Sequence, residues 1–162
     1  MKNFNPPGER MFALWRTVFA LVHVDGHLDE EERSYIEQVM DRFSFLPEQR
    51  AIVEIGLDEP ADVQALFAEV EGEERRRQFF RLARMIIWCD GLLHDDEREI
   101  LQEIWGSLSE DEATLYANEG RWLFRKPDTS SYEGEGDGAP QGALIEAVAA
   151  EMEAFYRARG SE

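Results

Sequence analysis

The chain has 162 residues, enough for one domain with a buried core, and its 17 basic against 35 acidic residues give a formal net charge of -18. This charge repels nucleic-acid phosphates and anionic membrane surfaces, so we expect neither as a direct partner. One cysteine excludes an internal disulfide, and no apolar run reaches the roughly 20 residues of a membrane-spanning helix. The first residues lack the apolar stretch of a signal peptide, and we expect a cytoplasmic protein.

The sequence contains an internal repeat, since residues 14–43 align with residues 79–108. The identical positions are Arg16/Arg81, Asp25/Asp90, Gly26/Gly91, Leu28/Leu93, Glu32/Glu97 and Arg33/Arg98. Apolar residues follow the helical spacing i, i+4, i+7 in both copies, on each side of the Asp-Gly pair. Each copy is therefore predicted to be a helix, an Asp-Gly elbow and a second helix.

Further helices are expected beyond this pair. Pro47 and Ser109 suit the start of a third helix in each copy, and residues 60–70 indicate a short amphipathic helix between the copies. No segment alternates with a period of two residues, so the predicted fold is all-α. The two copies, at about residues 11–56 and 76–119, should share one core. We expect its members to include Trp15, Phe19, Ile36, Phe80, Ile87 and Leu101.

Residues 126–142 are rich in glycine and acidic residues and are predicted to be a flexible linker before an amphipathic helix at 143–158. The apolar face of that helix needs a covering surface. We favour docking on its own bundle, because tethering raises the effective concentration, over an exchanged homodimer or a separate protein partner. The candidate contact residues are Leu144, Val148, Met152 and Phe155.

The elbows share some positions with calcium-binding EF-hand loops, but the first two carboxylates are missing in both copies, which excludes a regular EF-hand. Helix capping explains most of the motif, because Asp29 is a good N-cap with Glu32 three residues later. Leu28 and Leu93 are expected to enter the core. Capping leaves the aspartates before each glycine unexplained, so a divalent cation remains an alternative. Its candidate ligands are Asp25, Glu32, Asp90 and Glu97.

Other candidates have simpler interpretations. His23 and His27 have a zinc-like spacing, but the intervening Gly26 breaks the helix, and we interpret both as solvent-exposed. Cys89 beside His94 is interpreted as a buried, inert thiol.

The only basic cluster contains Arg77, Arg81 and Arg84 on one helix edge. These arginines either pair with acids on neighbouring helices or form a docking site for an acidic partner.

The two Asp-Gly hairpins, each followed by an acidic helix start, resemble the TerB-like (tellurite-resistance TerB) helical domains over residues 9–120. The resemblance implies a bundle of about seven helices with internal pseudo-symmetry. It also implies an acidic surface, metal binding by Asp25, Glu32, Asp90 and Glu97, and links to stress response and membrane-associated assemblies. The Gly-rich linker and the last helix depart from that pattern.

We expect a non-catalytic interaction or scaffold module in a bacterial stress-response or envelope-linked system. A divalent-cation-binding module is the first alternative, and a metal-dependent enzyme is the second. No phosphate-binding glycine loop, nucleophile elbow or HExxH motif stands in the sequence.

Overall fold

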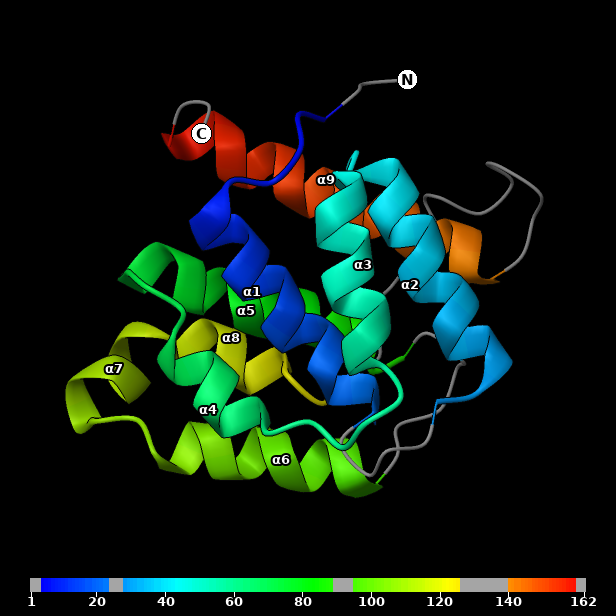
Figure 1. Ribbon diagram of the computed structural model, residues 1–162. Coiled ribbons are helices and arrows are strands. Elements are labelled where there is room, and N and C mark those ends of the chain that lie inside the picture. Colours follow the sequence, from blue (N-terminus) through cyan, green and yellow to red (C-terminus); the bar gives the residue numbers. More distant parts are fainter. Residues whose placement is uncertain (1–3, 24–27, 89–94, 126–139, 160–162) are drawn as a thin grey trace.

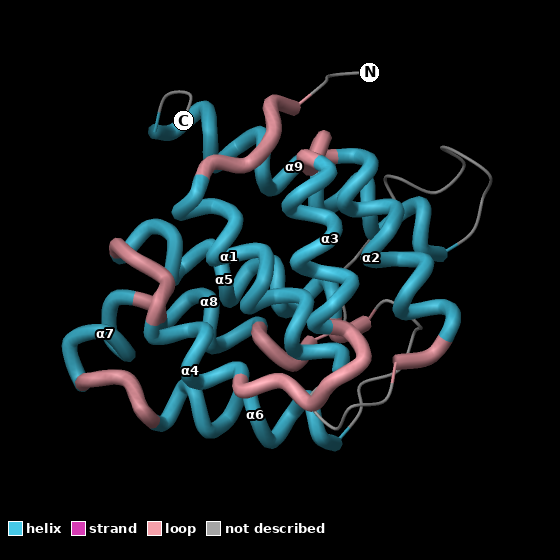
Figure 2. Tube along the Cα trace, viewed as in Figure 1, coloured by secondary structure: helices cyan, strands magenta, loops and turns pink. Residues whose placement is uncertain are grey.

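The structure is a computed structural model that describes residues 4–23, 28–88, 95–125 and 140–159. These residues are all-α, with no strand among them (Figure 2). The helices are α1 (Glu9–Ala20) with a 3-10 turn η1 (Leu21–His23), α2 (Glu30–Arg42), α3 (Pro47–Gly56), α4 (Val63–Ala68), α5 (Glu73–Ile86), α6 (Asp95–Gly106), α7 (Glu110–Leu115), α8 (Ala117–Trp122) and α9 (Pro140–Arg159). None of these helices has both the length and the hydropathy needed to cross a bilayer.

The predicted repeat is visible in the order of the helices. The first copy supplies α1, α2 and α3, and the second supplies α5, α6 and α7 (Figure 1). Local sequence explains where several of them begin. Asp29 caps α2, Pro47 is the first residue of α3, and the Ser109 side chain accepts a hydrogen bond from the Glu112 amide at the start of α7.

One hydrophobic core joins the two copies, as predicted. α1 packs against α4 and α5, and α9 packs against α2 and α5, so helices from both halves contribute to the same cluster. The six predicted core residues are all buried: Trp15, Phe19, Ile36, Phe80, Ile87 and Leu101. Leu28 is partly buried and packs against this core. Leu93 lies outside the described residues.

Two helices differ from the prediction in their boundaries, and one helix was not predicted. α4 is shorter than residues 60–70. α9 begins at Pro140, so residues 140–142 of the predicted linker are helical, while residues 126–139 lie outside the described part. α8 was not predicted, because its sequence carries no apolar stripe.

The first described residues pack against the last helix. The Phe4 ring lies 4.7 Å from that of Phe43 and 6.3 Å from that of Tyr156, measured between centroids. The Arg42 guanidinium lies 5.1 Å from the Phe4 ring centroid. An aromatic contact therefore connects the N-terminal segment, α2 and α9.

Candidate functional site

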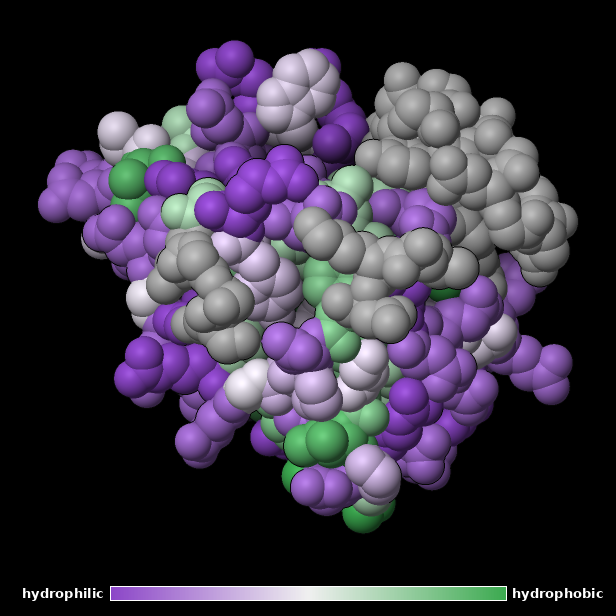
Figure 3. Space-filling model, turned by 90° about the horizontal axis from the view of Figure 1, so that it is seen from above, coloured by the Kyte–Doolittle hydropathy of each residue, from purple (hydrophilic) through white to green (hydrophobic). Residues whose placement is uncertain are grey.

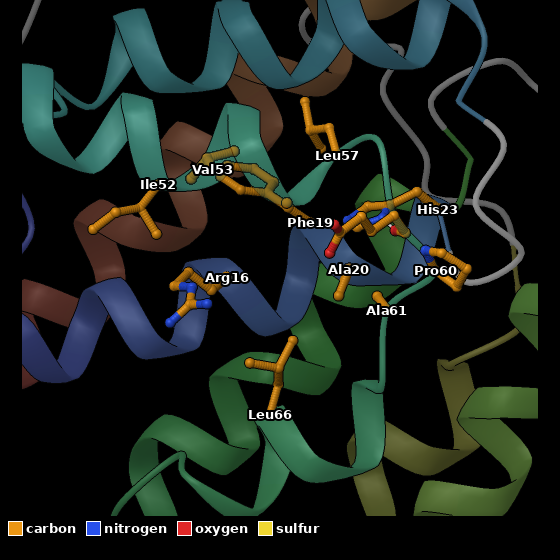
Figure 4. A pocket seen from close by; sticks show the side chains of 12 residues that line it. Arg16, Phe19, Ala20, His23, Ile52, Val53, Leu57, Pro60, Ala61 and Leu66 are labelled. Atoms are coloured by element: carbon orange, nitrogen blue, oxygen red, sulfur yellow. Dashed lines mark hydrogen bonds between the residues drawn. The ribbon is translucent and has the colours of Figure 1, made fainter.

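A groove of about 160 Å³, lined by both apolar and polar residues, lies between α1, α3 and α4 (Figure 4). Ile52 of α3 and Leu66 of α4 reach into it from opposite sides, with Arg16 of α1 between them. The remaining walls come from the end of α1 and η1, the end of α3 and the loop before α4. Together the lining residues are Arg16, Phe19, Ala20, His23, Ile52, Val53, Gly56, Leu57, Glu59, Pro60, Ala61 and Leu66.

The groove exists because α3 and α4 are short. α3 ends at Gly56 and α4 begins at Val63, and the loop between them lies beside the end of α1, where His23 contacts the Glu59 carbonyl (Figure 2). A Cβ atom at Gly56 would meet nothing within 4 Å. The apolar side of α1 faces the core through Leu14 and Val18, which leaves Arg16 exposed at the edge of the groove.

His23 closes one end of the groove and is buried, with 6% of its surface exposed. Its Nδ1 atom lies 3.0 Å from the carbonyl oxygen of Glu59, and donates to that oxygen in the tautomer that carries the proton on Nδ1. The interpretation of His23 as solvent-exposed was therefore wrong, because a loop distant in sequence covers the ring. His27 lies outside the described residues, so the zinc-like pair is not placed by the structure.

Arg16 lines the groove and differs in its charge partners from Arg10 and Arg33, which lie outside it. Its guanidinium carbon lies 6.0 Å from the Phe12 ring centroid, and no carboxylate in the described part of the chain forms an ion pair with it. By contrast, Arg33 pairs with Asp58 at 3.1 Å, and Arg10 pairs with Glu71 at 3.3 Å. The groove therefore carries a cation with no acidic partner among the described residues.

The apolar surface continues from the groove onto the outer side of α3. Ile52 is 45% exposed and Ile55 is 74% exposed, and their spacing of three residues places them on the same side of the helix. On the face shown in Figure 3, most of the described surface is hydrophilic and hydrophobic residues form a few separate patches. An exposed apolar patch beside a groove is typical of an interaction surface.

The predicted cation ligands are only partly described. Asp25 and Asp90 lie outside the described residues, whereas Glu32 and Glu97 are buried, with 8% and 4% of their surfaces exposed. Glu32 accepts a hydrogen bond from the Asp29 amide at 3.2 Å, and Asp29 accepts one from the Glu32 amide at 2.7 Å. This reciprocal pair confirms the predicted capping box. Within the described ranges no three His, Cys, Asp or Glu residues are grouped to hold a metal.

The predicted basic docking cluster binds groups of its own chain. Arg77 and Arg81 both form ion pairs with Glu119 of α8, at 3.4 Å and 3.3 Å. The Arg84 Nε atom donates to the carbonyl oxygen of Arg125 at 2.6 Å. In this arrangement the three arginines attach α8 and the segment after it to α5, instead of forming a free basic surface.

The predicted partner-binding face of the last helix also lies inside the molecule. Leu144, Val148, Met152 and Phe155 are all buried in the common core. The Gln78 amide of α5 donates to the Glu151 carbonyl at 3.4 Å and contacts the Met152 sulfur at 3.5 Å. In this structure α9 docks on its own bundle, and these four residues present no exposed partner surface. Cys89 and His94 lie outside the described residues.

The sequence analysis did not identify the groove. The available signal was the excess of apolar residues on α3, where Ile52, Val53 and Ile55 cover more of the helix than one core-facing side needs. The sequence analysis treated Arg16 only as a position shared by both copies. The absence of an ion pair between Arg16 and the described carboxylates depends on how α3 and α4 pack around it.

Comparison with known proteins identifies the family but assigns no activity. The chain is similar to a Yersinia enterocolitica protein described as "Uncharacterized protein in ampR 5'region", with 31% identity over 96 residues, which are 57% of this chain and 67% of the relative. No solved structure matches. The model of a family described as "Protein of unknown function (DUF533)" matches residues 9–118, which include α1 to α7 and the groove. The chain therefore belongs to the DUF533 family.

Proposed function

We propose that this DUF533 protein is a non-catalytic interaction module that binds a protein segment in the groove between α1, α3 and α4. The observation that carries the proposal is the exposure of Ile52 and Ile55 beside this open groove. Burial of one such side chain by a partner contributes roughly 1.5–3 kcal/mol. The groove lies within the segment matched by the family model, so the surface belongs to the family domain.

We also propose a cellular setting for this module. The all-helical repeat and the acidic composition support a TerB-like function, in the cytoplasm, as a scaffold within a stress-response or envelope-linked assembly. The partner in this proposal is a protein.

Photo-crosslinking in the native cell tests the proposal. A photoreactive amino acid replaces Glu59, which lines the groove, in the full chain. We expect a crosslinked adduct that disappears when Ile52 and Ile55 are both changed to Ser. The control is Leu115→Ser on α7, which changes an apolar residue with an exposed fraction (38%) close to that of Ile52 (45%). An adduct that survives the double substitution, or is lost equally in the control, would contradict the proposal.

Divalent-cation binding is a second candidate, favoured by the burial of Glu32 and Glu97 at matching positions of the two copies. A cation that binds only the folded state raises the melting temperature. We therefore propose thermal unfolding with calcium, magnesium or manganese, on the wild type and on the Asp25→Asn/Asp90→Asn variant. A metal-dependent rise that the variant lacks would support this function. Identical melting of both proteins at millimolar metal would leave only the capping role.

A further inference from the structure

The groove has room for one large apolar side chain. Its volume is about 160 Å³, and an apolar protein cavity of about 150 Å³ accommodates benzene. Phe19, Ala20, Val53 and Leu57 supply apolar walls around this space. The groove therefore suits a side chain of the size of Phe or Leu.

Arg16 supplies a positive charge at one end of this space, and the acidic Glu59 also lines the groove. The chain carries 35 acidic residues, yet Arg16 has no ion pair with any carboxylate that the structure describes. It stands among the groove-lining residues, whereas the paired Arg10 lies on the same helix away from the groove. An occupant that brings a carboxylate to this end would complete the charge pairing.

The distance along α1 fixes the spacing that such an occupant needs. Arg16 and Ala20 both line the groove and are four residues apart on α1, a rise of about 6 Å. On a helical segment lying along α1, this distance separates side chains three or four positions apart.

We propose that the groove binds a helical protein segment with a large apolar anchor and an Asp or Glu three or four positions from it, paired with Arg16. This inference rests on the proposed function and adds the chemistry of the partner. Ile52 and Ile55 extend the apolar surface beyond the pocket, which favours a helix over a small carboxylate. A second copy of the chain is disfavoured, because each copy carries a net charge of -18.

Selection of short random peptides against the full chain tests this chemistry, with affinities measured by fluorescence polarisation. We expect the selected peptides to combine Phe, Leu or Trp with an acidic residue at the stated spacing. Replacing the peptide's apolar anchor by Ala should weaken binding more than about tenfold. Arg16→Gln should weaken it about three- to fivefold. Arg16→Glu should reverse the preference, so that peptides with Lys at the acidic position bind better. Arg10→Gln is the matched control and should leave the affinity unchanged.

The outcomes separate this inference from the proposed function. Peptides whose binding requires Ile52 but neither an acidic residue nor Arg16 would overturn the inference and leave the interaction module standing. The absence of any peptide that depends on Ile52 would overturn both. A dimer in sedimentation that Ile55→Ser abolishes would identify a second copy as the occupant and overturn the inference. If octanoate binds as tightly as the selected peptides, the occupant is a small carboxylate and the inference of a helical segment is overturned.

Discussion

Gly120 of α8 shows how closely one residue position can be constrained. A Cβ atom there would lie 2.4 Å from the Cη2 atom of the Trp105 indole, far inside the normal contact distance. We expect Gly120→Ala to lower the free energy of unfolding by about 1–3 kcal/mol, because the indole has to shift. Denaturation in urea measures this change. Gly106→Ala is the control, since a Cβ atom at Gly106 meets nothing within 4 Å. An equal loss in both variants would contradict the role of the indole.

Tyr156 of α9 is expected to make the free energy of unfolding fall as the pH rises above about 10. Burial raises the pKa of Tyr156, and the Arg75 guanidinium opposes part of that rise. In the unfolded chain the phenol ionises near its ordinary value of about 10, while the folded state still holds the proton. The contribution of Tyr156 is thus present below about pH 10 and is lost as the pH rises through the higher folded pKa. Unfolding at about pH 9 and pH 11 should show a smaller loss of stability in Tyr156→Phe than in the wild type.

Single residues could be predicted from the sequence where their partners are local. Asp29 and Glu32 cap each other across three residues, so their spacing was sufficient. His23 bonds to a carbonyl 36 residues away, and no local pattern reports that contact. Arg16 is likewise not predictable from local sequence, because its surroundings are formed by three helices.

At the scale of elements, α8 is held by an ion-pair cluster. The Glu119 side chain is 9% exposed and pairs with both Arg77 and Arg81 of α5. Glu119→Gln should lower the free energy of unfolding by about 1–3 kcal/mol, because two guanidinium groups lose their carboxylate. Chemical denaturation of this variant beside Glu153→Gln provides the comparison, since Glu153 pairs with an Arg157 side chain that is 72% exposed. A Glu153 effect as large as that of Glu119 would show that burial of the pair is unimportant.

α9 is expected to contribute strongly to stability through its buried face. Met152 is fully buried beside Gln78, so Met152→Ala should cost about 2–5 kcal/mol. The same substitution should speed hydrogen exchange of the α9 amides, because docking supplies most of the stability of a single helix. Ala154→Ser changes an exposed position of the same helix and should leave both measurements near wild type. Wild-type stability of the Met152 variant would mean that α9 is not firmly docked.

Helices with a one-sided apolar pattern were predictable, and those without one were not. The apolar stripes of α1 and α2 in the first copy recur in α5 and α6 of the second. The helical periodicity therefore predicted these four helices and the core that they form. α8 has no such stripe, and its Gly120 argues against a helix when only the sequence is considered. The structure explains the glycine, because the Trp105 indole leaves no room for a Cβ atom at this position. The groove escaped prediction for a related reason: it depends on where α3 and α4 end relative to α1, which periodicity does not specify.

At the scale of the whole molecule, the common core predicts cooperative unfolding. Ile36 of the first copy and Leu101 of the second are both fully buried in one cluster. Ile36→Ala and Leu101→Ala should each shift one transition by about 2–5 kcal/mol, detected equally by circular dichroism and by tryptophan fluorescence. Two separate transitions, with each substitution moving only one of them, would contradict a shared core.

The contact between Phe4 and Tyr156 brings the two ends of the described chain to the same side of the bundle (Figure 1). Undocking of α9 removes this contact, so the end-to-end distance reports the docked state of that helix. A donor and an acceptor fluorophore attached near the two ends would therefore transfer energy efficiently while α9 is docked. The transfer efficiency would fall when α9 undocks from the bundle. Single-molecule fluorescence could therefore follow docking and undocking of α9.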